Sequence, residues 1–127
     1  MGLREPRLAV HLLHSTDEPD RVVAALRVLR AAAVGAAPTV GAPVLVLDLE
    51  GVRLAAKGVA ETLAGDGRPD VKALLASAVR AGAKVFVDGE AWRARGYADD
   101  ARIEGAELAD AGTVANLVAA GHVFVAY

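Results

Sequence analysis

The 127-residue sequence contains no cysteine. Disulfides, thiolate metal sites and cysteine nucleophiles are therefore excluded, because each of them requires a thiol. Aromatic residues are also few, with two Phe, two Tyr and one Trp. The small aliphatic side chains that replace them suit close packing of helices on a sheet, and they also suit subunit interfaces. The length predicts a single domain over residues 1–127.

The sequence also lacks an excess of one charge and long apolar runs. Its formal net charge is −2, and both signs are spread along the chain, so no electrostatic footprint for nucleic acid is visible. No apolar stretch approaches the roughly 20 residues that a membrane-spanning helix needs. The first residues, MGLREP, lack the apolar core of a signal peptide. These features favour a cytoplasmic protein with neither nucleic-acid nor membrane partners.

Short apolar segments alternate with segments of helical periodicity. The apolar segments predict β-strands over residues 7–13, 44–49, 85–87, 106–108 and 122–127. The periodic segments predict helices over residues 19–33, 52–63, 71–81, 91–95 and 113–120. Because the strands are apolar almost throughout, we expect a three-layer α/β sandwich, with a mainly parallel sheet of about five strands and helices on both faces.

Capping residues refine the helix boundaries. Residues 15–18, STDE, fit a capping box, and Pro19 suits the first turn of the helix that follows. Asp70 is expected to cap a helix that stops at Gly82, and Thr113 is expected to cap the last helix. The remaining connections are interpreted as a Gly/Pro/Ala linker over residues 35–43 and a loop over residues 64–69.

The most informative segment is residues 84–96, KVFVDGEAWRARG. A strand that ends in Asp-Gly and turns directly into a helix places the turn at the carboxyl end of the strand, where open α/β sheets hold their ligands. Asp88, with Gly89 behind it, is the first candidate, because its carboxylate can meet a basic ligand or act as an acid or base. The alternative is an ordinary helix N-cap, which needs no ligand.

The short helix after Asp88 adds four candidates, Glu90, Trp92, Arg93 and Arg95. Arginine suits bidentate recognition of carboxylate or phosphate groups. In the alternative interpretation, one arginine pairs with a nearby carboxylate and the other is solvated. The only Trp can cover a ligand or anchor a neighbouring subunit, or its ring can simply pack in the core.

The loops after the first two strands are expected at the same edge of the sheet, because the carboxyl ends of parallel strands meet there. His14 is a candidate acid or base that can work with Asp17 or Asp88. Asp48 and Glu50 add carboxylates, but no spacing indicates a metal site, and no cofactor is predicted. A Ser-His-Asp hydrolase has little support, because the sequence lacks a G-x-S-x-G motif.

Several sequence elements in fixed order carry a family resemblance. They are DLEGVRLAAKG at residues 48–58, AGAKVFV at 81–87, RARGY at 93–97, IEGAEL at 103–108, and AGTV at 111–114 with the closing VFV. Together they resemble the DsrE/DsrF-like family of small α/β proteins, which includes sulfur-relay subunits and YchN-like hexamers. The resemblance implies a parallel-sheet fold that assembles as trimers or hexamers, often with related subunits.

The departure from the family pattern concerns its chemistry. Members that carry sulfur as a persulfide often have cysteine directly after the third strand, at positions that correspond to Asp88 and Ala91 here. Neither residue can hold sulfane sulfur, because a persulfide needs a thiolate. A cysteine-dependent sulfurtransferase is therefore excluded, and catalysis of another kind is left open but not favoured.

Three functional hypotheses follow. The first is a non-catalytic DsrE-like binding or assembly protein that forms homo-oligomers. The second is a small-molecule-binding protein or enzyme with its site at the strand ends around Asp88. The third is a degenerate sulfur-relay subunit that docks on cysteine-bearing paralogues.

Overall fold

The computed structural model describes residues 7–35, 41–63 and 69–127, and its described strands form one parallel sheet in the order β4-β3-β2-β1-β5. The strands are β1 (Leu8–Leu12), β2 (Val44–Leu47), β3 (Lys84–Asp88), β4 (Ala106–Ala109) and β5 (Val123–Ala126). Each one lies within two residues of its predicted bounds. The predicted linker and the predicted loop lie for the most part outside the described residues.

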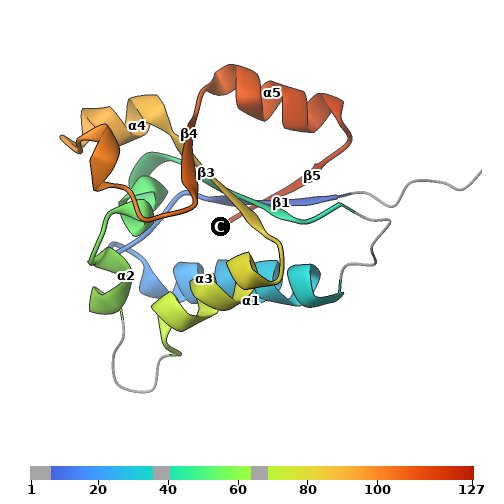
Figure 1. Ribbon diagram of the computed structural model, residues 1–127, viewed down its shortest axis with the longest axis horizontal. Helices are drawn as coiled ribbons and strands as arrows, with labels where there is room; N and C mark the ends of the chain where they lie inside the picture. The colour runs from blue at the N-terminus through green and yellow to red at the C-terminus, as the bar shows by residue number, and fades with distance from the viewer. Residues whose placement is uncertain (1–6, 36–40, 64–68) are drawn as a thin grey trace, which may run out of the picture.

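Helices lie on both faces of the sheet (Figure 1). Helices α1 (Pro19–Gly35) and α3 (Val71–Arg80) pack side by side on one face, while α4 (Gly89–Ala94) and α5 (Ala111–Ala119) lie over the other. The prediction of a three-layer α/β sandwich with a parallel sheet of five strands is confirmed.

The main core lies between the sheet and the α1–α3 layer. The parallel register aligns Leu12, Leu47 and Val87 across three strands, and all three side chains are fully buried. Helix α1 meets them with buried residues at helical spacing, among them Val22 and Leu26. Burial of each such side chain stabilises the fold by about 1.5–3 kcal/mol, so this layer holds the strand ends in a fixed arrangement.

The segment after β2 differs from its prediction as one helix. It forms a 3-10 helix, η1 (Leu49–Ala55), followed by the separate short helix α2 (Val59–Thr62). Between them Gly58 has φ 90, a left-handed conformation that a continuous helix does not contain. Ala56 also forms an antiparallel bridge with Arg102. The helical prediction was wrong here because this tertiary pairing pulls the chain out of helical geometry.

Two of the predicted caps were also wrong. Ser15 does not form a capping box, because its Oγ is buried without a hydrogen-bond partner among the described residues. Thr113 is the third residue of α5 rather than its cap. The cap is Asp110, whose carboxylate accepts from the Thr113 backbone N–H at 2.9 Å. The predicted Asp70 cap is confirmed, since its carboxylate accepts from Ala73 N at 3.1 Å.

The C-terminal helix and strand pack differently from the rest of the molecule. Helix α5 contains no charged residue, yet none of its residues is buried. Strand β5 forms one edge of the sheet and pairs only with β1 among the described strands. Its Val123 and Val125 are 48% and 38% exposed, and Val118 of α5 is 58% exposed. We call residues 111–126, from the start of α5 to the end of β5, the C-terminal unit.

Candidate functional site

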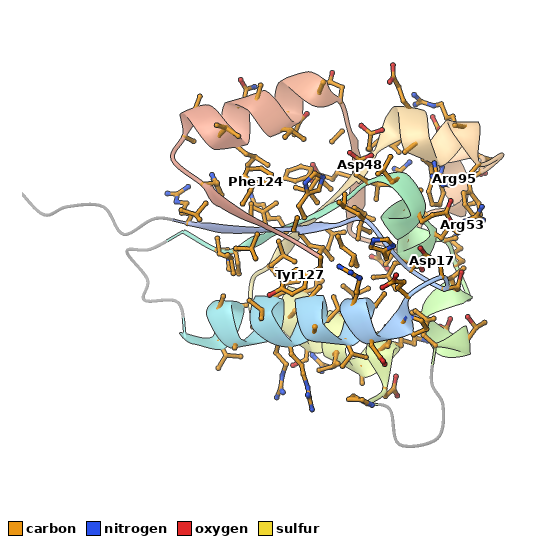
Figure 2. All side chains as sticks on the ribbon, turned by 180° about the vertical axis from the view of Figure 1, so that it is seen from behind. Asp17, Asp48, Arg53, Arg95, Phe124 and Tyr127 are labelled. Atoms are coloured by element: carbon orange, nitrogen blue, oxygen red, sulfur yellow. The ribbon has the colours of Figure 1, made fainter. Side chains whose placement is uncertain are left out.

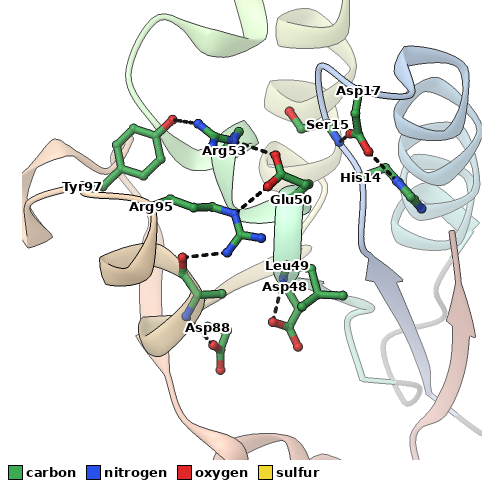
Figure 3. Close-up of polar contacts among 11 residues, drawn as sticks. His14, Ser15, Asp17, Asp48, Leu49, Glu50, Arg53, Asp88, Arg95 and Tyr97 are labelled. Carbon is green, nitrogen blue, oxygen red and sulfur yellow. Dashed lines mark hydrogen bonds and ion pairs between the residues drawn. The ribbon is translucent and has the colours of Figure 1, made fainter.

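Figure 3 shows the carboxyl edge of the sheet, where β1, β2 and β3 end and the candidate side chains from three loops meet. His14 and Asp17 follow β1, Asp48 and Glu50 follow β2, and Asp88 ends β3. Asp48 and Asp88 come from neighbouring strands, as expected from the parallel order. The edge therefore contains all three groups of predicted residues, although their side chains make different contacts.

His14 and Asp17 form a pair, as the sequence suggested. His14 Nδ1 lies 2.7 Å from Asp17 Oδ2, and Asp17 Oδ1 accepts from the Ser15 backbone N–H at 2.8 Å. The hydrogen bond from His14 is the main cause that lowers the pKa of Asp17 below its ordinary value. The Ser15 hydroxyl makes no bond to His14, so the pair does not extend into a hydrolase triad.

His11 is a site residue that the sequence interpretation missed. Its Nε2 lies 3.6 Å from Asp48 Oδ2, and its ring meets Phe124 of β5 edge-on with centroids 5.9 Å apart. Figure 2 shows Phe124 and Asp48 on the α5 side of the sheet. Strand alternation places Asp88 on this face as well. In the sequence, His11 lies two residues from both Ala9 and Leu13, and this even spacing places the three residues on one face of the strand. The spacing identifies the neighbours of His11 only once the register between strands is known.

Asp48 holds the backbone of the next residue in an unusual conformation. Leu49 has φ 48, the only positive φ at a non-glycine residue in the described part of the chain. Asp48 Oδ1 accepts from Leu49 N at 2.7 Å, and Asp48 O accepts from Gly51 N at 2.8 Å. The side chain of Leu49 is 54% exposed. Strained backbone of this kind costs about 1–3 kcal/mol and tends to occur at functional sites.

Glu50 and two arginines form an ion-pair network. Glu50 Oε2 accepts from Arg53 Nε at 2.7 Å, and Glu50 Oε1 accepts from Arg95 Nε at 2.9 Å. Arg53 also donates to the Tyr97 hydroxyl at 3.2 Å. The hydrogen bond from Arg53, followed by that from Arg95, lowers the pKa of Glu50, and Glu50 in turn raises the pKa of Arg53. Arg95 is thus paired rather than solvated.

The Trp92 side chain is fully buried within this chain. Its ring stacks on Tyr97 with centroids 4.4 Å apart, and its Nε1 donates to Ala98 O at 3.0 Å. In this arrangement the ring contacts neither solvent nor a neighbouring subunit. Core packing is therefore the role that the geometry describes.

The carboxylate of Asp88 accepts from the Ala91 backbone N–H at 2.8 Å and caps helix α4. Gly89 is buried at the first turn of that helix, and Glu90 is exposed beside it. Arg93 forms a two-pronged ion pair with Asp99, with both bonds near 3.0 Å. Asp88 thus occupies the position of an N-cap, and its side-chain partner among the described residues is the Ala91 backbone.

The carboxyl edge therefore combines two kinds of side chain. Those of Glu50, Arg93 and Arg95 are engaged in ion pairs. The His11–Asp48 and His14–Asp17 pairs are partly exposed, although His11 Nε2 itself is buried without a hydrogen-bond partner among the described residues. Within the described ranges, no three His, Cys, Asp or Glu side chains are grouped so that they could hold a metal ion. The same part of the chain contains no helix long and apolar enough to cross a membrane.

A five-stranded parallel sheet between two helical layers, with its polar loops at the carboxyl edge, defines a small three-layer α/β protein. The chain belongs to the DsrE/DsrF-like family, whose sequence profile matches residues 10–126. No curated protein sequence matches it significantly.

Two solved structures share this fold. The first is MTH1491 of Methanobacterium thermoautotrophicum, a protein of unknown function, with a TM-score of 0.73 and 15% identity over 97% of this chain and 100% of that one. The second is the ychN protein of E. coli, with a TM-score of 0.75 and 14% identity over 95% of this chain and 99% of that one. At such identities the likeness shows the fold alone.

Proposed function

We propose that this chain is a non-catalytic DsrE-like binding or assembly protein that associates with copies of itself, as a trimer or hexamer, and does not carry persulfide sulfur. The absence of cysteine supports the last part, because a persulfide forms only on a thiolate. Asp88 and Ala91, which stand where sulfur-carrying relatives often have cysteine, are joined by the cap of α4. That position therefore has a structural use that needs no sulfur.

The observation that carries the proposal is the apolar but unburied C-terminal unit. Helix α5 has nine residues, none of which is charged and none of which is buried in the core. An isolated helix of this length is marginal in water, and most helices are stabilised by burial of an apolar face. We infer that Val118 and its neighbours on α5 are buried against another copy of the chain.

The edge strand β5 supports the same conclusion. Exposed edge strands usually carry charged residues or proline that prevent pairing with other chains. β5 has the sequence VFVA, with neither feature, and its Val123 and Val125 are partly exposed. A surface of this composition is suited to a second copy, because obligate homo-oligomer interfaces are more apolar than the rest of a protein surface.

The test is the oligomeric state of the full chain at micromolar concentration, measured by native mass spectrometry and light scattering. The wild type is expected to have a mass three or six times that of the subunit. Val118→Lys and Val125→Lys are expected to shift it to monomer. Val34→Lys is the matched control, because Val34 is 66% exposed but lies on α1, and this variant is expected to keep the oligomer. A strictly monomeric wild type would contradict the proposal.

The second candidate function is a small-molecule site at the carboxyl edge of the sheet. It is supported by the His11–Asp48 contact next to the strained residue Leu49. Native mass spectrometry of protein purified from its own host tests it, because a retained ligand adds a few hundred daltons. Asp48→Asn should then reduce the fraction of the protein that retains the ligand. Glu90→Gln, at an exposed residue of α4, should leave that fraction unchanged.

The third candidate is a degenerate relay subunit that docks on cysteine-bearing paralogues. It uses the same C-terminal unit but predicts a different partner. Co-purification of a second, cysteine-containing protein in the native mass spectrum would favour it over self-assembly.

A further inference from the structure

A separate hollow lies at the amino ends of the strands, at the opposite edge of the sheet from the candidate site. Its volume is about 330 Å³, and it opens between the sheet and the C-terminal end of α5. Lys84 and Val44 begin β3 and β2, Arg7 precedes β1, and His122 precedes β5. The hollow is thus built from four chain segments that only the fold brings together.

The ionisable side chains that line this hollow are all basic. Arg7, Lys84 and His122 line it, and no acidic residue of the described chain does. Neither Arg7 nor Lys84 makes a side-chain hydrogen bond or ion pair within the described residues. His122 Nδ1 lies 3.0 Å from Leu117 O, which leaves Nε2 available. A concave surface with charge of one sign attracts the opposite charge more strongly than a flat one does.

The rest of the lining is apolar. Val44, Phe86 and Leu117 contribute it, from β2, β3 and α5. The strand register pairs Val44 with Lys84, and Phe86 follows two residues after Lys84, so the basic head group and the aromatic ring share one face of the sheet. An apolar body can therefore rest on the Phe86 side while an anionic group reaches the cations.

Gly41 provides the space for the Arg7 side chain. A Cβ at Gly41 would lie 2.3 Å from Arg7 Nε and 2.4 Å from Cζ. The guanidinium therefore occupies space that any other residue at position 41 would fill. The backbone of Gly41 is not left-handed, so the glycine serves the close approach rather than a turn.

We propose that this hollow binds a small organic anion with an apolar, preferably aromatic, body. Arg7 and Lys84 pair with the anionic group, and Phe86 and Leu117 contact the body. The volume lies near the lower limit of about 300–1,000 Å³ for small-molecule sites, which corresponds to a ligand of one or two rings. The carboxylates of the candidate site lie at the opposite edge of the sheet and take no part in this binding.

The test compares two fluorescent compounds that share one ring system. 8-Anilinonaphthalene-1-sulfonate carries a sulfonate, and N-phenyl-1-naphthylamine lacks it. The full-length wild type is expected to bind the sulfonate about tenfold more tightly than the neutral compound. Lys84→Gln and Arg7→Gln are each expected to weaken binding of the sulfonate about three- to tenfold and to leave the neutral compound unaffected. Gly41→Ala should weaken binding of the sulfonate less than Arg7→Gln does, because it shifts the end of the flexible Arg7 side chain without removing its charge.

Arg27→Gln is the control variant. It removes a positive charge from a different basic hollow, which Arg27 and Arg30 line on α1. It is expected to change neither affinity. Equal affinity of the wild type for both compounds would overturn the proposal. So would loss of sulfonate binding in Arg27→Gln with no effect of Lys84→Gln. Lys84 is exposed, so circular dichroism of its variant should match the wild type and exclude unfolding as the cause.

Competition distinguishes the possible sources of the anion. Benzoate, phenyl phosphate and inorganic phosphate are each used to displace the bound sulfonate. Stronger competition by benzoate indicates a carboxylate ligand, and stronger competition by phenyl phosphate indicates a phosphorylated one. Both results support the proposal. Inorganic phosphate that competes as well as either aromatic compound would overturn it, because the apolar lining would then contribute nothing.

Discussion

Arg95, the C-cap residue of α4, donates from Nε to Glu50 Oε1 over 2.9 Å and so joins the helix after β3 to the 3-10 segment after β2. The side chain of Arg95 is only 20% exposed, and its guanidinium also donates to Ala91 O at 3.1 Å. Two residues that the sequence suggests as ligand contacts are therefore engaged with each other. The pair joins the two strand-end segments that carry Asp48 and Asp88 (Figure 3).

The Glu50–Arg95 pair is expected to contribute measurably to stability. Glu50→Gln and Arg95→Gln should each lower the free energy of unfolding by about 1 kcal/mol, because the pair is partly exposed. In a double-mutant cycle measured by urea unfolding, the coupling energy should be about 0.5–1 kcal/mol. Arg93→Gln is the control, since its pair with Asp99 is more exposed and should contribute less. A coupling energy of zero would show that the two loops are held by packing alone.

Stability should fall in the acid range as the carboxylates of Glu50 and Asp17 are protonated. The pKa of each is lower in the folded protein than its ordinary value, mainly through Arg53 for Glu50 and His14 for Asp17. A depressed carboxyl pKa stabilises the fold above the ordinary value, about 4.3 for Glu and 3.9 for Asp, and this stabilisation is lost as pH falls below it. Urea unfolding between pH 7 and pH 3 should show the loss, and Glu50→Gln should make it smaller. An unchanged pH profile in that variant would contradict the assignment.

Leu49→Asn is expected to stabilise the protein by about 0.5–1 kcal/mol. Leu49 has φ 48, and asparagine tolerates this left-handed conformation better than leucine does. Little burial is lost, because the Leu49 side chain is largely exposed. Leu49→Ala keeps the strain and serves as the control in thermal unfolding. If the Asn variant is no more stable than the Ala variant, the backbone at Leu49 is not strained in solution.

Gly51→Ala is expected to destabilise the fold by about 3 kcal/mol or more. A Cβ at this position would lie 2.1 Å from Leu12 O, which is backbone at the end of a central strand and cannot move aside cheaply. Gly35→Ala, at the end of α1, meets nothing within 4 Å and should be neutral or slightly stabilising. Chemical denaturation of both variants provides the measurement. Equal stability of the two would mean that η1 can move away from β1.

The fold itself could be predicted from local patterns. Strands such as residues 44–47 and 85–87 are apolar on both faces, and this pattern requires helical layers on each side. The prediction of one helix over residues 52–63 was wrong because distant residues intervened at Ala56, whose bridge to Arg102 interrupts the expected helix. Thr113 was misassigned because Asp110, three residues earlier, is the stronger capping residue.

The candidate site could be predicted only in part from the sequence. The position of Asp88, Asp48 and His14 at the ends of strands follows from chain order, because parallel strands end at one edge. The contact partner of each side chain does not follow from chain order. His11 meets Asp48, and Arg95 meets Glu50 rather than solvent, through contacts that span 37 and 45 residues of sequence. Such pairings depend on strand order and register, and composition or spacing along one segment contains no information about them.

Cysteine chemistry was excluded by the sequence alone, because no arrangement of atoms can supply a thiol that the chain lacks. Family membership was likewise indicated by the order of short motifs, and the match over residues 10–126 confirms it. Only the tertiary structure decided that the apolar helix α5 is left unburied and that Arg7, Lys84 and His122 line one hollow. The physical reason is that burial and convergence are properties of packing between layers, and segments with the same local pattern can end on a covered face or on an open one.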